Sequence, residues 1–353
     1  MRRGNEASEP FKRGKKSIAL DLKQEEGRVI FKKLCSRADV VIEPFRPGVM
    51  EKLGLGPSTL SEVNQRLIYA RLSGFGQTGP MSKAAGHDIN YLAISGVLSL
   101  LGAAEPAKPN PPINILADFA GGGLSGAFGI LVALFERMSS GKGQVVDANL
   151  VEGTAYVSSG QWLTRDRNNT VSQIVWPNRD ERGRNLLDGG APYYQVYRCK
   201  DGKYMAIGSL EPQFYSGLMK GLGLEENDYN QYDIESWPKT VQKFQEVFLT
   251  KTQNEWTEIF TPLDCCVTPV INADQAADHP HNKERGTFMA SGHPRPAPLL
   301  SRTPALPELT EPRFAQHTAE LLTSLGYSNQ QLKDFADRGI IALDESSGIK
   351  SSL

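Results

Sequence analysis

Residues 40–43 read Val40-Val41-Ile42-Glu43, and residues 66–73 read Arg66-Leu67-Ile68-Tyr69-Ala70-Arg71-Leu72-Ser73. Both are short apolar runs that contain β-branched or aromatic residues, which predicts two buried strands. Residues 58–65 lie between them and predict a helix with Ser58 as its N-cap. Two strands joined by a helix are typical of a parallel sheet, because parallel strands need a long crossover connection.

The same alternation continues on both sides of this segment. Residues 17–22 predict an earlier strand, and residues 25–37 predict an amphipathic helix. A long apolar helix is expected over 122–138, followed by a strand over 144–148. The first part of the chain is therefore expected to be an α/β domain with helices on both faces of a parallel sheet.

The pattern changes after about residue 190 and predicts a smaller α+β domain over 191–290. Two alternating runs, 193–199 and 204–209, surround Asp201-Gly202, which is a strong hairpin signal. Helices are expected over 213–222, 238–250 and 254–260, and, after a proline-rich linker, over 316–326 and 329–337.

Composition narrows the classes of function. The 353 residues include 39 basic and 40 acidic side chains, so no basic surface for nucleic acid is indicated. The four cysteines are sparse and lack CxxC spacing, which predicts reduced thiols. His279 and His281 could bind a metal as a pair, but no Cys or Glu cluster accompanies them, so no metal site is expected.

Hydropathy predicts no membrane span. The longest apolar run, 124–135, is interrupted by Gly126 and Gly129 and is followed by Glu136-Arg137, so we expect a buried helix. Residues 1–6 lack the apolar core of a signal peptide.

Two short motifs carry the candidate chemistry. Gly86-His87-Asp88-Ile89-Asn90-Tyr91 and Asp118-Phe119-Ala120-Gly121-Gly122-Gly123 each place a proton-transfer group at the mouth of an expected helix. Helix N-termini present free N–H groups and the positive end of the helix dipole, which suits developing negative charge. His87 and Asp118 could therefore act as a pair on opposite faces of a carbon acid. Taken singly, His87 also fits a structural histidine, and Asp118 fits an N-cap.

Seven ordered segments resemble the α-methylacyl-CoA racemases of the family III CoA-transferase (CaiB/BaiF-type) superfamily. They are residues 67–77, 86–91, 117–123, 141–148, 187–192, 211–215 and 266–270. The resemblance implies a Rossmann-like large domain over 1–190, the small domain over 191–290, and a segment over 291–353 that returns to the large domain. It also implies a homodimer of two interlocked chains.

The resemblance further implies an opening βαβ unit, and this chain starts where that unit would be finished. A parallel sheet without its first strand and helix exposes an apolar edge. We therefore expect a version extended by such a unit to be more stable or more active, unless residues 1–16 or the C-terminal return cover the edge.

The activity implied by the resemblance is an isomerase reaction that interconverts (2R)- and (2S)-2-methylacyl-CoA thioesters through an enolate, without a cofactor. His87 and Asp118 would be the two bases, and the backbone N–H of Asp88 would donate to the enolate oxygen. Glu211, from the same chain or from the partner in the dimer, would orient the imidazole. The substrate would contact the rest of the His87 motif, namely Gly86, Asp88, Ile89, Asn90 and Tyr91.

The resemblance also indicates which residues would hold CoA. They follow the expected strands, where ligands of open α/β sheets bind, and they are Leu20, Lys23, Pro44, Phe45, Arg46 and Lys52. Arginine and lysine suit contacts with phosphate, although any one of them could equally be a solvated surface charge. Gly121-Gly122-Gly123 lacks the GxGxxG spacing of a dinucleotide site, and we interpret it as allowing either thioester approach or tight helix packing.

Two other functions stay open. In a CoA transferase of the same superfamily, the carboxylate at position 118 would form a mixed anhydride with the acyl group, but such an enzyme needs no base at His87. An inactive acyl-CoA-binding protein is the third possibility, because of the short N-terminus. The C-terminal Ser351-Ser352-Leu353 is close to a peroxisomal signal, so we expect a peroxisomal or mitochondrial enzyme of branched-chain fatty-acid and bile-acid-type lipid metabolism.

Overall fold

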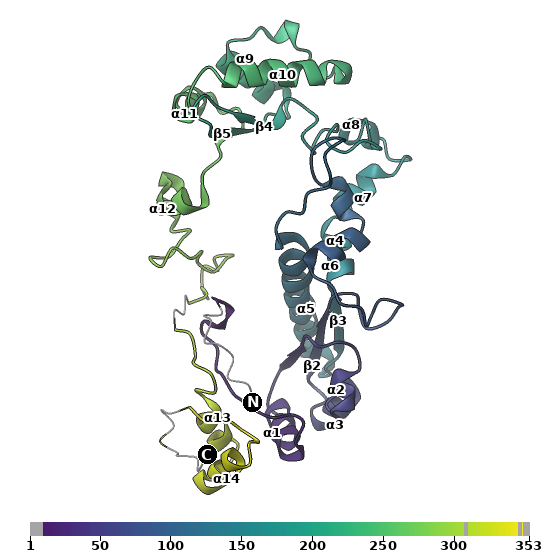
Figure 1. Ribbon diagram of the computed structural model, residues 1–353, viewed down its shortest axis with the longest axis vertical. Coiled ribbons are helices and arrows are strands. Elements are labelled where there is room, and N and C mark those ends of the chain that lie inside the picture. The colour runs from purple at the N-terminus through teal and green to yellow at the C-terminus, as the bar shows by residue number, and fades with distance from the viewer. Residues whose placement is uncertain (1–9, 307–309, 345–347, 349–353) are drawn as a thin grey trace. The chain divides into compact units, whose positions relative to one another are not determined.

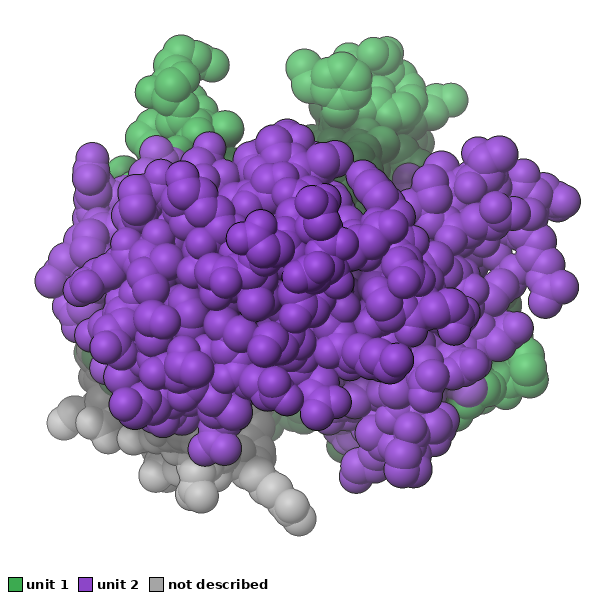
Figure 2. All heavy atoms as spheres, turned by 90° about the horizontal axis from the view of Figure 1, so that it is seen from above, with its two compact units in different colours: residues 1–85, 122–149, 289–353 green, residues 86–121, 150–288 purple. Residues whose placement is uncertain are grey.

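The computed structural model describes residues 10–306, 310–344 and 348. The chain divides into two compact units, which Figure 2 colours separately. The first unit contains residues 1–85, 122–149 and 289–353, and the second contains residues 86–121 and 150–288. Residues 86–121 and 150–190, which we expected in the large domain, are therefore grouped with the second unit.

The first unit contains the parallel sheet that the sequence predicted (Figure 1). Its strands are β1 (Val40–Glu43), β2 (Ile68–Ser73) and β3 (Val145–Asn149), in the order β1-β2-β3. Val40 pairs with Ile68, and Tyr69 pairs with Val145. Its helices are α1 (Glu25–Cys35), α2 (Val49–Lys52), α3 (Pro57–Val63) and α5 (Ser125–Ser140).

Two local predictions in this unit are wrong. Residues 17–22 form no regular strand; Leu20 makes only an isolated bridge with Ile341, because the segment lies against the C-terminal part of the chain. Helix α3 begins at Pro57 with Gly56 as its N-cap, two residues before the expected cap Ser58. Proline suits the first helical position, since its missing N–H would have no partner there.

The C-terminal helices pack against the first helix of the chain. Helices α13 (Thr318–Ser324) and α14 (Asn329–Asp337) contribute Leu322 and Leu332 to a buried cluster that also contains Ile30 of α1. The backbone N–H of Asp21 donates to the carbonyl of Ile340 at 2.8 Å. These contacts bring residues about 300 positions apart into one core.

Helix α5 is not the buried helix that we expected. It packs on β2 and β3 through small residues: a Cβ added at Gly129 would lie 3.1 Å from Val146, and Ala133 is buried. Its other face exposes large apolar side chains, namely Phe128, Leu131, Val132, Phe135 and Met138. The apolar run was a misleading sign of burial, because its glycines face the sheet and its bulky residues lie on the opposite face of the helix.

The helical stretch Ile115–Ser140 is also long and apolar enough to cross a membrane by length and composition. Only 22% of its most apolar window is buried within the protein. The core helices of soluble proteins pass the same test of length and composition, so this feature alone assigns no membrane topology.

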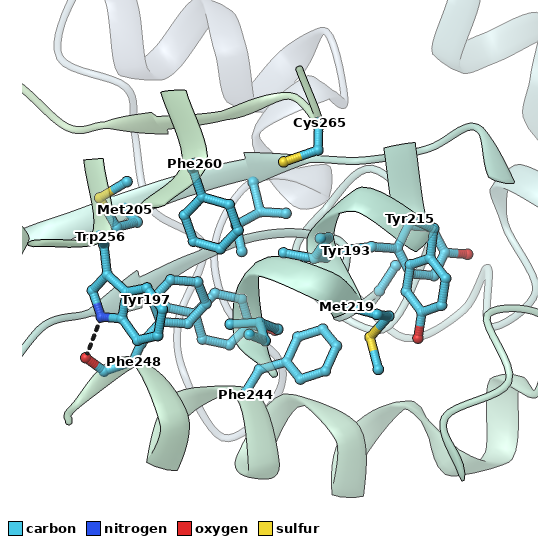
Figure 3. Close-up of a cluster of buried hydrophobic side chains, with 14 of the residues drawn as sticks. Tyr193, Tyr197, Met205, Tyr215, Met219, Phe244, Phe248, Trp256, Phe260 and Cys265 are labelled. Carbon is cyan, nitrogen blue, oxygen red and sulfur yellow. Dashed lines mark hydrogen bonds between the residues drawn. The ribbon is translucent and has the colours of Figure 1, made fainter. Parts of the chain in front are cut away.

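The second unit is built on an antiparallel sheet and an aromatic core. Strands β4 (Tyr194–Arg198) and β5 (Tyr204–Gly208) form the expected hairpin, and β6 (Val267–Pro269) adds to β5. The expected helices are present as α9 (Pro212–Leu222), α10 (Trp237–Phe248) and α11 (Gln253–Phe260). Figure 3 shows the aromatic side chains that these elements bury together, with the indole N–H of Trp256 donating to the carbonyl of Phe248 at 2.9 Å.

The remaining helices of the second unit are short. They are α4 (Asp88–Ile94), α6 (Leu150–Val157), α7 (Ser159–Arg165), α8 (Ser172–Val175) and α12 (Pro280–Arg285). A π-helix, Ile115–Leu124, runs directly into α5. Short 3-10 turns of the second unit occur at Val97–Leu100, Glu226–Asp228, Ile234–Ser236, Thr261–Leu263 and Ala273–Asp278, and one in the first unit occurs at Pro10–Lys12. Helix α4 packs against α6, which places the His87 motif within this unit.

Candidate active site

His87 is the N-cap of helix α4, as the sequence predicted. Its backbone is extended, with φ −132° and ψ 176°, and its N–H donates to Oδ1 of Asn90 at 3.1 Å. Its carbonyl accepts the N–H of Asn90 at 2.8 Å, which closes the first turn. The backbone is therefore fixed from both sides, while the residue is exposed to solvent.

Asp118 lies inside a helix and not at its N-cap, so that part of the prediction is wrong. The π-helix begins at Ile115, and Asp118 is still within its first turn. The wider π-helical backbone is uncommon and is often found at functional sites. The side chain is half-buried, and its Oδ2 accepts a hydrogen bond from Nδ2 of Asn114 at 3.3 Å.

Asp88 joins these two motifs through its side chain. Its carboxylate is buried, and Oδ2 accepts the backbone N–H groups of Ala117 at 2.8 Å and Asp118 at 2.9 Å. The residue that follows His87 is thus hydrogen-bonded to the backbone of Asp118, which ties the N-terminus of α4 to the segment that carries Asp118. From the sequence we expected a role only for the backbone N–H of Asp88, which lies in the first helical turn, where the helix itself supplies no acceptor.

The glycines after Asp118 allow tight packing of the π-helix. A Cβ at Gly121 would lie 2.6 Å from the backbone nitrogen of Thr154 in α6, and a Cβ at Gly153 would lie 1.8 Å from the carbonyl oxygen of Gly121. Of the two interpretations of Gly121-Gly122-Gly123, the structure therefore supports helix packing at Gly121. This contact holds the segment that carries Asp118 against α6.

Replacement of Asp88 is expected to move Asp118. In Asp88→Ala, the N–H groups of Ala117 and Asp118 lose their acceptor, and each buried unpaired group costs about 1–3 kcal/mol. In Asp88→Asn, the amide oxygen can still accept both hydrogen bonds. We expect turnover of a 2-methylacyl-CoA to fall at least about tenfold further in Asp88→Ala than in Asp88→Asn, with CoA affinity changed little.

Steady-state kinetics of the two variants, with urea unfolding of each, tests this order. Equal loss of turnover in both variants would mean that the charge of Asp88, and not its acceptor geometry, matters. Wild-type turnover in Asp88→Ala would mean that Asp88 is not needed to position Asp118.

Glu211 is the exposed N-cap of α9, and its carbonyl accepts the N–H groups of Phe214 at 3.0 Å and Tyr215 at 2.9 Å. Burial and then the Glu211 charge raise the pKa of the Cys266 thiol, so the carboxylate lies near Cys266. Among the described residues, no hydrogen bond joins Glu211 to His87. Its role in orienting the imidazole stays a prediction.

The remaining residues of the His87 motif differ in their exposure. The hydroxyl of Tyr91 donates to the carbonyl of Gly86, which folds this ring back over the motif. Ile89 and Asn90 are exposed on the first turn of α4. Their contacts with a substrate stay predictions.

The residues expected to hold CoA lie in the first unit. Pro44, Phe45 and Arg46 form an exposed loop at the carboxyl end of β1, and Lys52 is exposed at the end of α2. Lys23 is exposed as well, whereas Leu20 is half-buried and packs in the cluster with the C-terminal helices. A direct CoA contact by Leu20 therefore stays a prediction that its packing does not favour.

The loop at 44–46 is anchored by a buried ion network that the sequence analysis missed. Glu43 accepts the N–H of Phe45 at 3.0 Å and Nε of Arg71 at 2.8 Å. Arg71 also donates to Glu51 at 2.7 Å and 3.3 Å. Burial alone would lower the pKa of Arg71, but the hydrogen bonds and charges of the two glutamates outweigh it, and the pKa lies above its ordinary value. A glutamate that ends one strand and an arginine near the end of the next parallel strand could have indicated this network.

All four cysteines are free thiols, in agreement with the expectation of reduced cysteines. Burial raises the pKa of Cys35, Cys199 and Cys265 to about 11, so these thiols are poor nucleophiles at neutral pH. Within the part of the chain that the structure describes, no group of three or more His, Cys, Asp or Glu side chains is clustered as metal ligands would be.

Comparison with known proteins agrees with this architecture. The chain is 51% identical over 339 residues to the α-methylacyl-CoA racemase of Mus musculus, which covers 94% of this chain and 87% of the mouse protein. It is 51% identical over 347 residues to the α-methylacyl-CoA racemase of Homo sapiens, and this match covers 97% of this chain and 88% of the human protein. The crystal structure of a CaiB/BaiF family protein from Brucella suis superposes with a TM-score of 0.74 at 25% identity, over 89% of this chain and 82% of that one. The family model described as CoA-transferase family III matches residues 2–318, and the chain belongs to this family.

Proposed function

We propose that this protein is a racemase that interconverts the (2R) and (2S) forms of 2-methylacyl-CoA thioesters. The observation that carries the proposal is the Asp88 carboxylate, which connects the α4 N-terminus at His87 with the backbone of Asp118. Two proton-transfer groups of different kinds are thereby held in one unit. The two racemases that are 51% identical to this chain support the same reaction.

The reaction needs one proton removed and one returned. One base takes the proton from C2 of the thioester, and the C–H electron pair moves into an enolate. The conjugate acid of the other group then protonates C2 on the opposite face, which inverts the centre. His87 suits this role because imidazole can accept or donate a proton near neutral pH.

The enolate oxygen carries the developing negative charge and needs hydrogen-bond donors already in place. The backbone N–H of Asp88 lies in the first turn of α4, and the positive end of the helix dipole points in the same direction. Proton transfer of this kind requires only acid–base groups and a donor, so we propose that the enzyme works without a metal or redox cofactor.

The alternative activities receive less support. A CoA transferase would use the Asp118 carboxylate as a nucleophile, and the exposed imidazole at the helix N-terminus would then have no role. An inactive acyl-CoA-binding protein would need neither His87 nor Asp118 in a fixed position.

The purified protein is expected to exchange the C2 proton of a 2-methylacyl-CoA with solvent deuterium and to interconvert the two epimers. Proton NMR in D₂O follows the loss of the C2 proton signal, and chiral chromatography follows the epimers. Activity should be unchanged by a chelator. Acyl transfer to a carboxylate acceptor without epimerisation, or activity lost with chelator and restored by metal, would contradict the proposal.

We also propose that the protein forms a homodimer. The exposed apolar face of α5, with Phe128, Leu131, Phe135 and Met138, is the kind of surface that a second copy would cover. Sedimentation equilibrium of the wild type and of Phe135→Asp tests this, since the charge should weaken the dimer if this face lies in the interface.

A peroxisomal or mitochondrial location in branched-chain lipid metabolism is proposed from the sequence alone. The segment Ser351-Ser352-Leu353 lies outside the described residues. Imaging of the protein with its C-terminus free, beside a variant that lacks these three residues, tests whether they act as an address.

A further inference from the structure

A polar cavity of about 310 Å³ lies within the second unit, and the proposed chemistry does not use it. Its lining comes from the end of α7, from the segment after α8 and from residues near 100. The charged side chains that line it are four arginines and four acids, namely Arg165, Arg179, Arg182, Arg184, Glu105, Asp180, Glu181 and Asp188. Equal numbers of arginines and acids suggest that the cavity lining is neutral overall. The arginines and acids are not all paired with one another, however.

Two of the arginines are already paired. Arg182 lies 3.4 Å from Glu105 and donates to the carbonyl of Ala103 at 3.0 Å. Arg184 lies 3.0 Å from Glu181. Their charges are therefore matched within the cavity wall.

Asp188 is satisfied by a different set of donors. Its carboxylate accepts the backbone N–H groups of Gly183 at 2.8 Å and Asn185 at 2.7 Å, and the side-chain amide of Asn185 at 2.8 Å. The carboxylate thus fixes the loop, and no arginine donates a hydrogen bond to it among the described residues.

The other two arginines lack a comparable partner. The Nε and Nη1 groups of Arg179 are buried and have no hydrogen-bond acceptor in the described part of the chain. The nearest carboxylate is Asp180, at 4.0 Å from Nε, and its side chain is 80% exposed. Arg165 stacks over the ring of Trp176, 4.7 Å from its centroid, and a ring face supplies no negative charge equal to a carboxylate.

Arg165 and Arg179 also oppose each other electrostatically. Burial, and next the charge of Arg179, lower the pKa of the Arg165 guanidinium, while Asp180 and Asp188 act in the opposite direction. Buried N–H groups of a charged side chain without an acceptor are costly, and two guanidinium groups on one cavity add repulsion. An anion between them would offset this repulsion.

We propose that this cavity binds phosphate, free or as a phosphomonoester, between Arg165 and Arg179. Guanidinium groups match phosphate oxygens in pairs, and Arg165 and Arg179 both line the cavity without donating a hydrogen bond to any described residue. The cavity is larger than one phosphate group, so it has room for part of the molecule that carries it. The site is independent of the proposed racemase chemistry, since it would stand equally if Asp118 acted as a nucleophile.

Calorimetric titration of the full chain with inorganic phosphate, at ionic strength held constant with NaCl, tests the site. Arg179→Gln and Arg165→Gln should each weaken phosphate binding at least about tenfold, because each loses a charged hydrogen-bond donor. The matched control is Arg198→Gln, which changes an exposed arginine of β4 in the same unit and should bind as the wild type does.

Melting in phosphate-free buffer separates binding from a structural role. Arg179 donates no hydrogen bond to the described residues, and its carboxylate neighbour Asp180 is 80% exposed and 4.0 Å away, so Arg179→Gln should melt no lower than the wild type, and phosphate should no longer raise its melting temperature. A lower melting temperature without phosphate would overturn the proposal, because Arg179 would then stabilise the fold through protein contacts.

Titration with CoA and with 3′-dephospho-CoA identifies the source of the phosphate. If CoA supplies it, Arg179→Gln weakens CoA binding about tenfold and leaves binding of 3′-dephospho-CoA unchanged. If the natural ligand is free phosphate or another phosphomonoester, CoA and 3′-dephospho-CoA both bind the variant as they bind the wild type, and only the binding of inorganic phosphate is lost. Wild-type affinity of Arg179→Gln for inorganic phosphate and for CoA alike would overturn the proposal.

Discussion

His87→Ala and Asp118→Ala are each expected to abolish interconversion of the two epimers of a 2-methylacyl-CoA. A positioned acid or base contributes about 10²–10⁴-fold to the rate, and inversion needs both groups in every turnover. Affinity for CoA should stay within a few-fold, because these side chains act on the reacting carbon and not on the nucleotide.

Solvent exchange makes this test sharper than turnover alone. With Asp118 removed, His87 can still take the proton from the epimer that presents it on its side and return a deuteron to the same face. Asp118→Ala should therefore exchange the C2 proton of one epimer, and His87→Ala that of the other epimer. Neither variant should invert the configuration at C2. His281→Ala and Asp274→Ala, which change exposed residues of the same unit, are the matched controls. Near-normal inversion in either active-site variant would rule out the two-base assignment.

Arg71→Met is expected to cause the largest loss of stability. Arg71 is 8% exposed and donates to Glu43, which is 2% exposed, and also to Glu51. Removing one partner of a buried ion pair leaves an uncompensated charge and costs about 3–5 kcal/mol. Urea unfolding should show this decrease, and the exposed Arg302→Met, in the same unit, should change the unfolding free energy little.

The difference in unfolding free energy between the wild type and Arg71→Met should also depend on pH. Burial raises the pKa of Glu51, but the hydrogen bonds that it accepts from Arg71 and from the backbone, together with the charge of Arg71, outweigh this, and the pKa in the folded state lies below the ordinary 4.5. A lowered folded-state pKa gives stability that is fully present above the unfolded value and is lost as the pH falls through the folded one. The stability gap should thus be constant near neutral pH and should narrow below about pH 4.5. If this difference in unfolding free energy does not change down to pH 3, the ion pair with Glu51 contributes nothing to the stability that Arg71→Met loses.

The local sequence was sufficient for several elements. The apolar runs at β1, β2 and β3, the hairpin around Asp201-Gly202 and the helices α9 to α11 were predicted from composition and spacing. The N-cap position of His87 was predicted in the same way. These features depend on interactions between residues a few positions apart, and such interactions are visible in the order of the residues themselves.

Other features depended on contacts between distant residues. Residues 17–22 have the composition of a strand, but the carbonyl of Ile340 accepts the N–H of Asp21, and the N–H of Ala342 donates to the carbonyl of Ala19. The apolar composition of α5 predicted burial, while its glycines on the sheet side direct the large side chains outward. In both cases the local preference was overridden by what the rest of the chain placed nearby.

The sequence by itself determined the α/β class, most of the helices and strands, and the identity of His87 and Asp118 as candidate bases. Only the tertiary structure showed that Asp88 binds the backbone of Asp118, that Arg71 joins Glu43 to Glu51, and that Arg179 lacks a buried acceptor. The physical reason is that burial decides what a charged side chain does. A carboxylate or guanidinium in water needs no particular partner, whereas a buried one must find donors or acceptors, and these come from residues about 20 to 30 positions away that only folding brings within reach.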